Sequence, residues 1–113
     1  MNIGLSSFLN YSKVSLAMRF LESEYKPIIK AILNNGFEEA EFSFVKKRGR
    51  VNVVHSESSQ TFFFHRKSET VLNASRQWEE QVSYTFGEGK EALWSETFDT
   101  VISALNQWLA KLA

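Results

Sequence analysis

The stretch that decides the fold covers residues 41–67 and reads EFSFVKKRGRVNVVHSESSQTFFFHRK. It contains three runs of aromatic and β-branched residues, which are separated by two polar turns. Runs of this composition favour β-strands, and short polar turns join consecutive antiparallel strands. The stretch therefore predicts three antiparallel strands at residues 41–45, 51–55 and 61–66.

The turn between the first two strands sets their register. A loop of two or four residues keeps four apolar side chains on one face of the sheet: Phe42, Phe44, Val51 and Val53. A two-residue turn would place Arg48 in the left-handed region, which a residue with a Cβ disfavours. We therefore expect a longer loop in which Gly49 takes that conformation.

Three consecutive phenylalanines form the third strand. Side chains alternate along a strand, so Phe62 and Phe64 share a face and Phe63 points the other way. Either both faces of this strand are covered, or Phe63 is exposed. We expect the exposed alternative, which makes Phe63 a candidate contact residue.

Helical periodicity marks both ends of the chain. Apolar residues at spacings of three and four precede the sheet, but Pro27 interrupts them. Two helices are expected, at residues 12–22 and 25–34, with Ser23 as a cap between them; a single kinked helix is the alternative. Asn35 and Gly36 signal the end of this region. A stripe of apolar residues over residues 94–112 predicts the C-terminal helix.

The segment between these regions completes the predicted sheet. Residues 68–79 fit either a strand followed by a loop or a helix, and we expect the strand. Val82, Tyr84 and Phe86 alternate with polar residues, as in a strand buried on one face. The prediction is a single α+β domain over residues 1–113. It contains a single-layer antiparallel meander of four or five strands, with the N-terminal helix or helix pair and the C-terminal helix packed on one face.

Composition limits the function. The chain of 113 residues is 43% hydrophobic and contains no cysteine, which excludes disulfides, thiolate catalysis and iron–sulfur clusters. No apolar run approaches the roughly 20 residues of a membrane helix, so no membrane association is expected. The N-terminal residues lack the basic start and apolar core of a secretory signal, and we expect a cytoplasmic protein.

Motifs for metal, nucleotide or nucleophilic chemistry are absent from the sequence, so no catalytic residue, metal or cofactor is expected. The histidines are His55 and His65. In a hairpin, the two histidines would lie one or two rungs apart. Because side chains alternate along a strand, the other possibility is that they point to opposite faces of the sheet. Close together, they would resemble the acid and base of a two-histidine nuclease, with Arg66 or Lys67 holding a phosphate.

Charge is segregated although the net charge is zero: residues 46–67 contain six basic residues and one acidic residue. This asymmetry and the aromatic residues nominate a partner-binding set: Lys46, Lys47, Arg48, Arg50, Phe63, His65, Arg66, Lys67 and Trp78. The expected function is a non-catalytic protein-interaction module, such as an adaptor, an inhibitor or a small subunit of a larger assembly. An RNA- or DNA-binding accessory protein that uses the basic turn is the alternative. The acidic residues that follow would also permit a homodimer.

Overall fold

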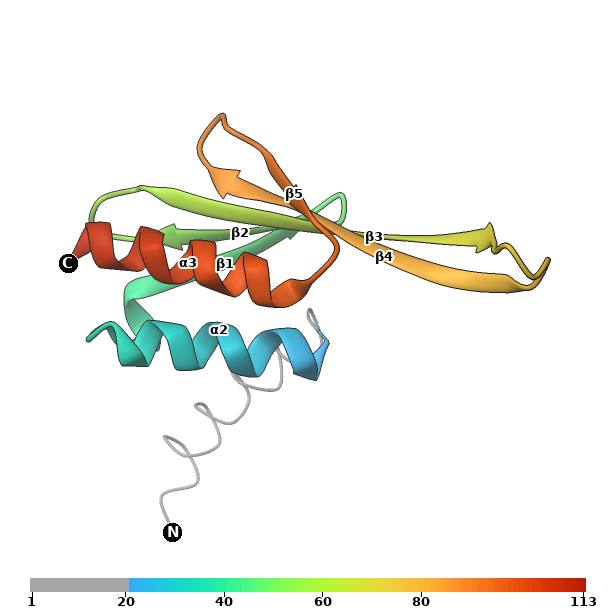
Figure 1. The fold of residues 1–113 in the computed structure, drawn as a ribbon. Helices are drawn as coiled ribbons and strands as arrows, with labels where there is room; N and C mark the ends of the chain where they lie inside the picture. Colours follow the sequence, from blue (N-terminus) through green and yellow to red (C-terminus); the bar gives the residue numbers. More distant parts are fainter. Residues whose placement is uncertain (1–20) are drawn as a thin grey trace, which may run out of the picture.

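A computed structural model describes residues 21–113, which form one antiparallel sheet and two α-helices (Figure 1). The strands follow one another in the order β1-β2-β3-β4-β5, so each pairs with its neighbour in the chain. They are β1 (Phe42–Lys47), β2 (Arg50–His55), β3 (Thr61–Leu72), β4 (Trp78–Glu88) and β5 (Leu93–Ser95). The helices are α2 (Glu22–Asn34), the 3₁₀ turn η1 (Glu39–Glu41) and α3 (Phe98–Leu112). The predicted α+β meander is confirmed.

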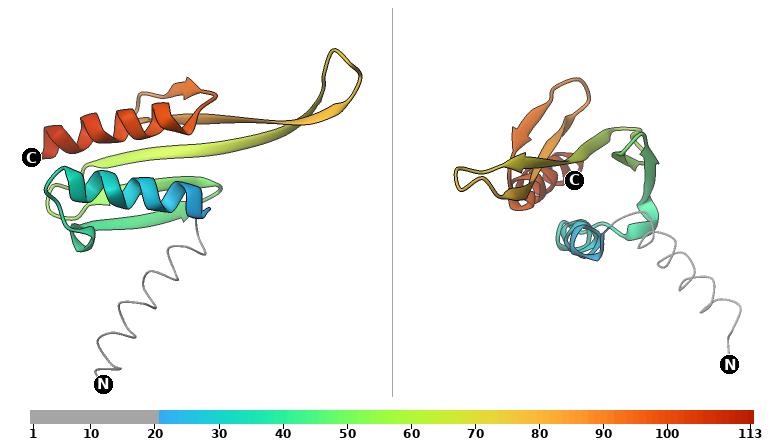
Figure 2. Two further views of the ribbon diagram at one scale, coloured as in Figure 1. Left: turned by 60° about the horizontal axis from the view of Figure 1, so that its bottom comes forward. Right: turned by 90° about the vertical axis from the view of Figure 1, so that its right-hand side faces the viewer.

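Both α-helices pack on the same face of the curved sheet (Figure 2). Trp108 of α3 lies at the centre of the core, where its ring centroid is 6.1 Å from that of Phe42 and 5.9 Å from that of Phe62. Each buried aromatic removes a large apolar area from water, so few residues build this core. Its buried members are Ile28, Ala31, Ile32, Phe42, Phe44, Val51, Val53, Phe62, Phe64, Tyr84, Phe86, Val101, Leu105, Trp108 and Leu109.

The helix α2 begins earlier than predicted. The carbonyl oxygen of Leu21 accepts hydrogen bonds from the backbone N–H groups of Glu24 and Tyr25, both at 2.9 Å. Ser23 therefore lies inside the helix and does not cap it, and Pro27 is tolerated within it. The predicted stop is confirmed, because Asn35 caps the helix and Gly36 takes φ +84°. Most of the predicted helix at residues 12–22 lies outside the described residues.

The helix α3 begins later than predicted, and Trp94 belongs to β5. Leu93–Ser95 pair with β4, and the Oγ of Ser95 accepts a hydrogen bond from the backbone N–H of Thr97 at 3.1 Å. Such local side-chain bonds compete with the helical backbone pattern. From Phe98 onwards, the predicted apolar stripe faces the core. Among residues 21–113, neither α-helix has the length and apolar character that crossing a membrane requires.

The turn between β1 and β2 also differs from the prediction. Lys47 pairs with Arg50, so only two residues connect the strands. Arg48 takes φ +53° and Gly49 takes φ +79°, as in a type I′ turn. The expectation of a longer loop was wrong. A primed turn matches the twist of the two strands, and this match offsets the strain at Arg48, about 1 kcal/mol.

The strands β3 and β4 extend far beyond the helices as a two-stranded ribbon (Figure 1). The pairing of β3 with β2 ends at His65, and the pairing of β4 with β5 ends at Tyr84. We call the ribbon beyond these positions, residues 66–83, the arm. The predicted strand within residues 68–79 is confirmed as the end of β3, and a loop follows it. The arm contributes to principal-axis extents of 57 × 35 × 24 Å.

Candidate interaction surfaces

The sheet face opposite the helices is open in the part of the chain that the structure describes. On this face, one residue from each strand forms a continuous cross-strand row. The pairs in register are Lys47 with Arg50, Arg50 with His65, His65 with Thr85, and Thr85 with Trp94. Directly paired residues point to the same side of a sheet. The five-strand row therefore places basic side chains at one end and an indole at the other.

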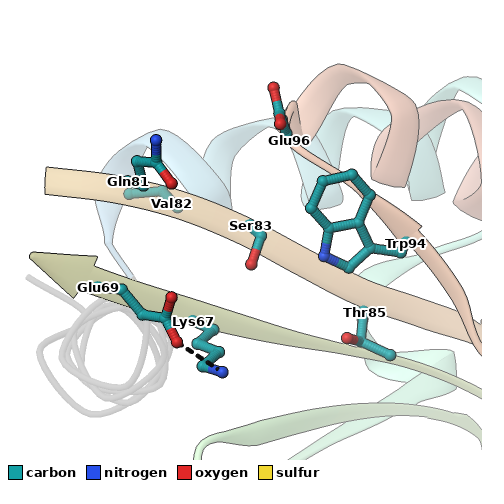
Figure 3. A pocket seen from close by; sticks show the side chains of 8 residues that line it. All are labelled: Lys67, Glu69, Gln81, Val82, Ser83, Thr85, Trp94 and Glu96. Atoms are coloured by element: carbon teal, nitrogen blue, oxygen red, sulfur yellow. Dashed lines mark ion pairs between the residues drawn. The ribbon is translucent and has the colours of Figure 1, made fainter. Parts of the chain in front are cut away.

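Trp94 ends the row beside an open groove of about 540 Å³ (Figure 3). Its indole is 62% exposed and stands along one side of this groove. Lys67 and Glu69, two residues apart on β3, form an ion pair at 2.7 Å beside the groove, and both are exposed enough for water to weaken it (Figure 3). The lining residues are Lys67, Glu69, Gln81, Val82, Ser83, Thr85, Trp94 and Glu96. Sequence reasoning missed Trp94, because its spacing to Phe98 matches a helical stripe.

Phe63 lies on the open face but is only 3% exposed, so the expectation of an exposed Phe63 was wrong. The guanidinium carbon of Arg50 lies 4.0 Å from the centroid of its ring, a cation–π contact. On β4, the residue paired with Phe63 is Gly87, where the backbone of Glu91 comes so close that no Cβ would fit. Arg50 and the β4–β5 loop therefore cover Phe63, and both faces of β3 are buried at this position.

Strand alternation divides the predicted basic residues between two faces. Lys47, Arg50, His65 and Lys67 belong to the open face, whereas Lys46 pairs with a core residue, Val51. Arg66 also points to the helix side, where its Nη2 lies 3.4 Å from Oε1 of Glu80. The predicted basic residues therefore do not form one continuous surface.

Glu24, in the first turn of α2, is a buried carboxylate that the sequence analysis did not single out. It is 7% exposed, and its Oε2 has no hydrogen-bond partner among the described residues. Burial raises the pKa of Glu24, although a backbone hydrogen bond at Leu21 and the charges of Arg66 and Lys46 act in the opposite direction. A carboxylate is common in the first turn of a helix, so no sequence signal distinguished this one.

The two histidines do not form a common site. His55 is buried, and its Nδ1 lies 2.8 Å from Oγ of Ser58. His65 pairs with Arg50, at the far end of β2 from His55. The expectation that they lie one or two rungs apart was wrong, whereas their placement on opposite faces is confirmed. The rings cannot act together on one phosphate.

Trp78 begins β4 at the far end of the arm, where it pairs with Leu72 of β3. Their exposed fractions are 72% and 53%. The turn beyond them is held by Asn73, whose Oδ1 accepts hydrogen bonds from the backbone N–H groups of Ser75 and Gln77, both at 2.9 Å. The end of the arm therefore presents two apolar side chains on a structured hairpin.

Residues 21–113 contain no cluster of three or more His, Cys, Asp or Glu side chains that would hold a metal ion. Comparison of the chain with protein-family models, curated proteins and solved structures gives no match.

Proposed function

We propose that this protein is a non-catalytic protein-interaction module, and that its arm contacts the partner. One observation carries the proposal: Leu72 and Trp78 are paired and exposed at the end of a ribbon that extends beyond the core. A tryptophan in contact with a partner buries a large area and is enriched among the residues that dominate binding energy.

The geometry of the arm supports this role. Asn73 orders the turn, so little conformational freedom remains to be lost at the tip when a partner binds. No strand of residues 21–113 pairs with the outer edges of the arm, but these edges carry charged residues such as Lys67, Glu69 and Glu79. Charges on an edge oppose indiscriminate strand addition. The apolar tip is therefore a better candidate contact than the backbone edges.

The experiment is quantitative affinity purification from the source cells with tagged protein. The test variant combines Leu72→Ser with Trp78→Ser, and the control is Trp94→Ser, which removes the exposed tryptophan on the open face. Proteins captured by the wild type and the control should be lost from the test variant. Equal recovery with all three proteins contradicts the proposal.

Two measurements complete this experiment. Urea unfolding should give free energies within about 0.5 kcal/mol for the three proteins, because all the substituted side chains are exposed. Sedimentation over a concentration series identifies the case in which the partner is a second copy of this chain. In that case, the double variant should stay monomeric at concentrations where the wild type associates.

A further inference from the structure

We infer that the open face of the sheet binds a short segment of single-stranded nucleic acid along the five-strand row. This inference does not depend on Leu72 and Trp78 at the tip of the arm, because the row and the groove beside it lie at the base of the arm. Strands in a sheet are spaced by about 4.8 Å, so the row spans roughly 19 Å from Lys47 to Trp94. A stacked strand advances about 3.4 Å per nucleotide and an unstacked strand advances further, so this length corresponds to at most roughly six nucleotides.

The β1–β2 end of the row is suited to phosphates. Lys47, Arg48 and Arg50 form no ion pair with any carboxylate of the described residues. By contrast, four other cations in this part of the chain each have a carboxylate partner: Lys26, Arg66, Lys67 and Lys111. The positive charge at the β1–β2 turn is therefore available to an anionic backbone.

The side chain of Arg50 is held in place before a ligand binds. Its guanidinium lies over the buried ring of Phe63, which restricts the side chain while the N–H groups at the edge of the plane stay able to donate. A restricted arginine loses less conformational freedom when it binds a phosphate. Phe63 thus takes part in binding by supporting Arg50 and does not itself contact the ligand.

The β5 end of the row is suited to a base. The exposed indole of Trp94 offers a stacking surface, and stacking on aromatic side chains is how single strands are held without sequence preference. Beside it, the groove presents the amide of Gln81 and the hydroxyls of Ser83 and Thr85, which donate and accept hydrogen bonds. Glu69 is paired with Lys67, and the carboxylate of Glu96, which has no ion pair among the described residues, disfavours a phosphate there.

The different chemistry of the two ends of the row, basic at β1–β2 and aromatic at β5, selects the ligand. An acidic peptide would match the β1–β2 end but would meet the carboxylate of Glu96 at the other end and would offer no ring to Trp94. A duplex keeps its bases stacked on one another, so Trp94 could not reach a base face. A single strand supplies both an anionic backbone and unstacked rings, and it fits both ends of the row.

The test is fluorescence anisotropy of a labelled single-stranded oligonucleotide of about eight nucleotides, slightly longer than the span of the row. The same sequence as a duplex and an acidic peptide of similar charge are titrated in parallel. We expect the single strand to bind most tightly, with affinity that falls as salt rises. No binding of the single strand at low salt, or tighter binding of the duplex or the peptide, overturns the inference.

Matched variants separate the two ends of the row. Lys47→Glu should weaken binding and reduce the slope of log affinity against log salt by about 0.7 for each phosphate that the protein no longer neutralises. Lys30→Glu, the same change on the exposed side of α2, should leave the affinity unchanged. Trp94→Leu should weaken binding roughly five- to a hundredfold with the salt slope unchanged, whereas Trp78→Leu should have no effect.

Loss of binding in Lys47→Glu with full binding in Trp94→Leu overturns the inference, because charge attraction alone would then account for the complex. Trp78→Phe provides a spectroscopic check, since only Trp94 and the buried Trp108 remain as tryptophans. Addition of the unlabelled oligonucleotide should quench the emission of this variant. Unchanged emission at saturation likewise contradicts stacking on Trp94.

Discussion

Phe63 shows how much one residue depends on its surroundings. Alternation along β3 requires it to point away from Phe62 and Phe64, and the structure agrees. Two parts of the chain cover that second face. One is Arg50, which lies on β2 two residues from the partner of Phe63, and the other is the β4–β5 loop, which follows Phe63 by more than twenty residues. The cover on Phe63 therefore results from tertiary contacts that no local pattern reports.

At the residue scale, Gly87→Ala should lower the free energy of unfolding by about 1–3 kcal/mol, the usual range for overpacking a buried position. The added methyl group would meet the backbone of Glu91, so the β4–β5 loop must move away from Phe63. Urea unfolding measures the loss. Thr85→Ala, on the same face of β4, is the control. A loss for Gly87→Ala of less than about 0.5 kcal/mol would mean that the loop moves freely.

The candidate site could be predicted only in part at this scale. The basic residues at the β1–β2 turn were identified from composition, and Lys47 and Arg50 lie on the open face as part of the row. Lys46 and Arg66 were grouped with them because they are adjacent in sequence, although alternation sends their side chains to the helix side. Trp94 was missed because its spacing to Phe98 fits a helix as well as a strand.

Elements were predicted more accurately in their interiors than at their ends. The stripe of α3 identified Val101, Leu105 and Leu109 as buried, because a helix that packs on a sheet needs one apolar face. Its start follows instead from contacts that periodicity does not describe: Leu93–Ser95 pair with β4, and the Thr97 N–H donates a hydrogen bond to Ser95 Oγ. The start of α2 likewise depended on the carbonyl of Leu21, which periodicity does not describe.

Glu24 gives α2 a dependence on pH. Because burial raises its pKa in the folded state, the folded protein binds this proton more tightly than the unfolded chain does. The contribution of Glu24 to stability therefore falls as pH rises from its ordinary pKa of 4.5 through the raised value, and it stays unfavourable above that. Glu24→Gln should unfold at a higher urea concentration than the wild type at pH 7, and the difference should disappear in acid.

The control for this prediction is Glu22→Gln, at the exposed first residue of α2. The Lys26 ammonium, 2.8 Å away, lowers the pKa of Glu22, so its small contribution to stability is present at neutral pH and is lost in acid. The two variants should therefore differ from the wild type in opposite directions. Lower stability of Glu24→Gln at pH 7 would mean that attraction to Arg66 and Lys46 exceeds the effect of burial.

At the scale of the whole molecule, the arm explains why residues 68–79 were ambiguous. Inside the core, one face of each strand is buried, and this produces the alternation that identified the strands. Beyond the helices both faces of the ribbon are exposed to solvent, so the sequence there no longer alternates. The overall α+β meander was predictable because the core requires it, whereas the length of the arm was not.

The arm should be removable without loss of the fold. Glu69 pairs with Gln81, so replacing residues 70–80 with Asn-Gly would close a shorter hairpin through a type I′ turn. We expect a change in unfolding free energy of less than about 1 kcal/mol, because the removed side chains are mostly exposed. Small-angle scattering should show a smaller radius of gyration. A large loss of stability would show that the ribbon supports the core.

The sequential order of the strands has a consequence for folding. Every strand pairs with the one before it in the chain, so the sheet can grow by successive hairpins, each closing a short loop. Contacts between the helices span a much greater separation, as in the hydrogen bond that Asn35 donates to Asn106. Chains rich in local contacts pass their folding barrier sooner than chains that must first close long loops. The ribbon can therefore form early, and the meeting of α2 with α3 completes the native state.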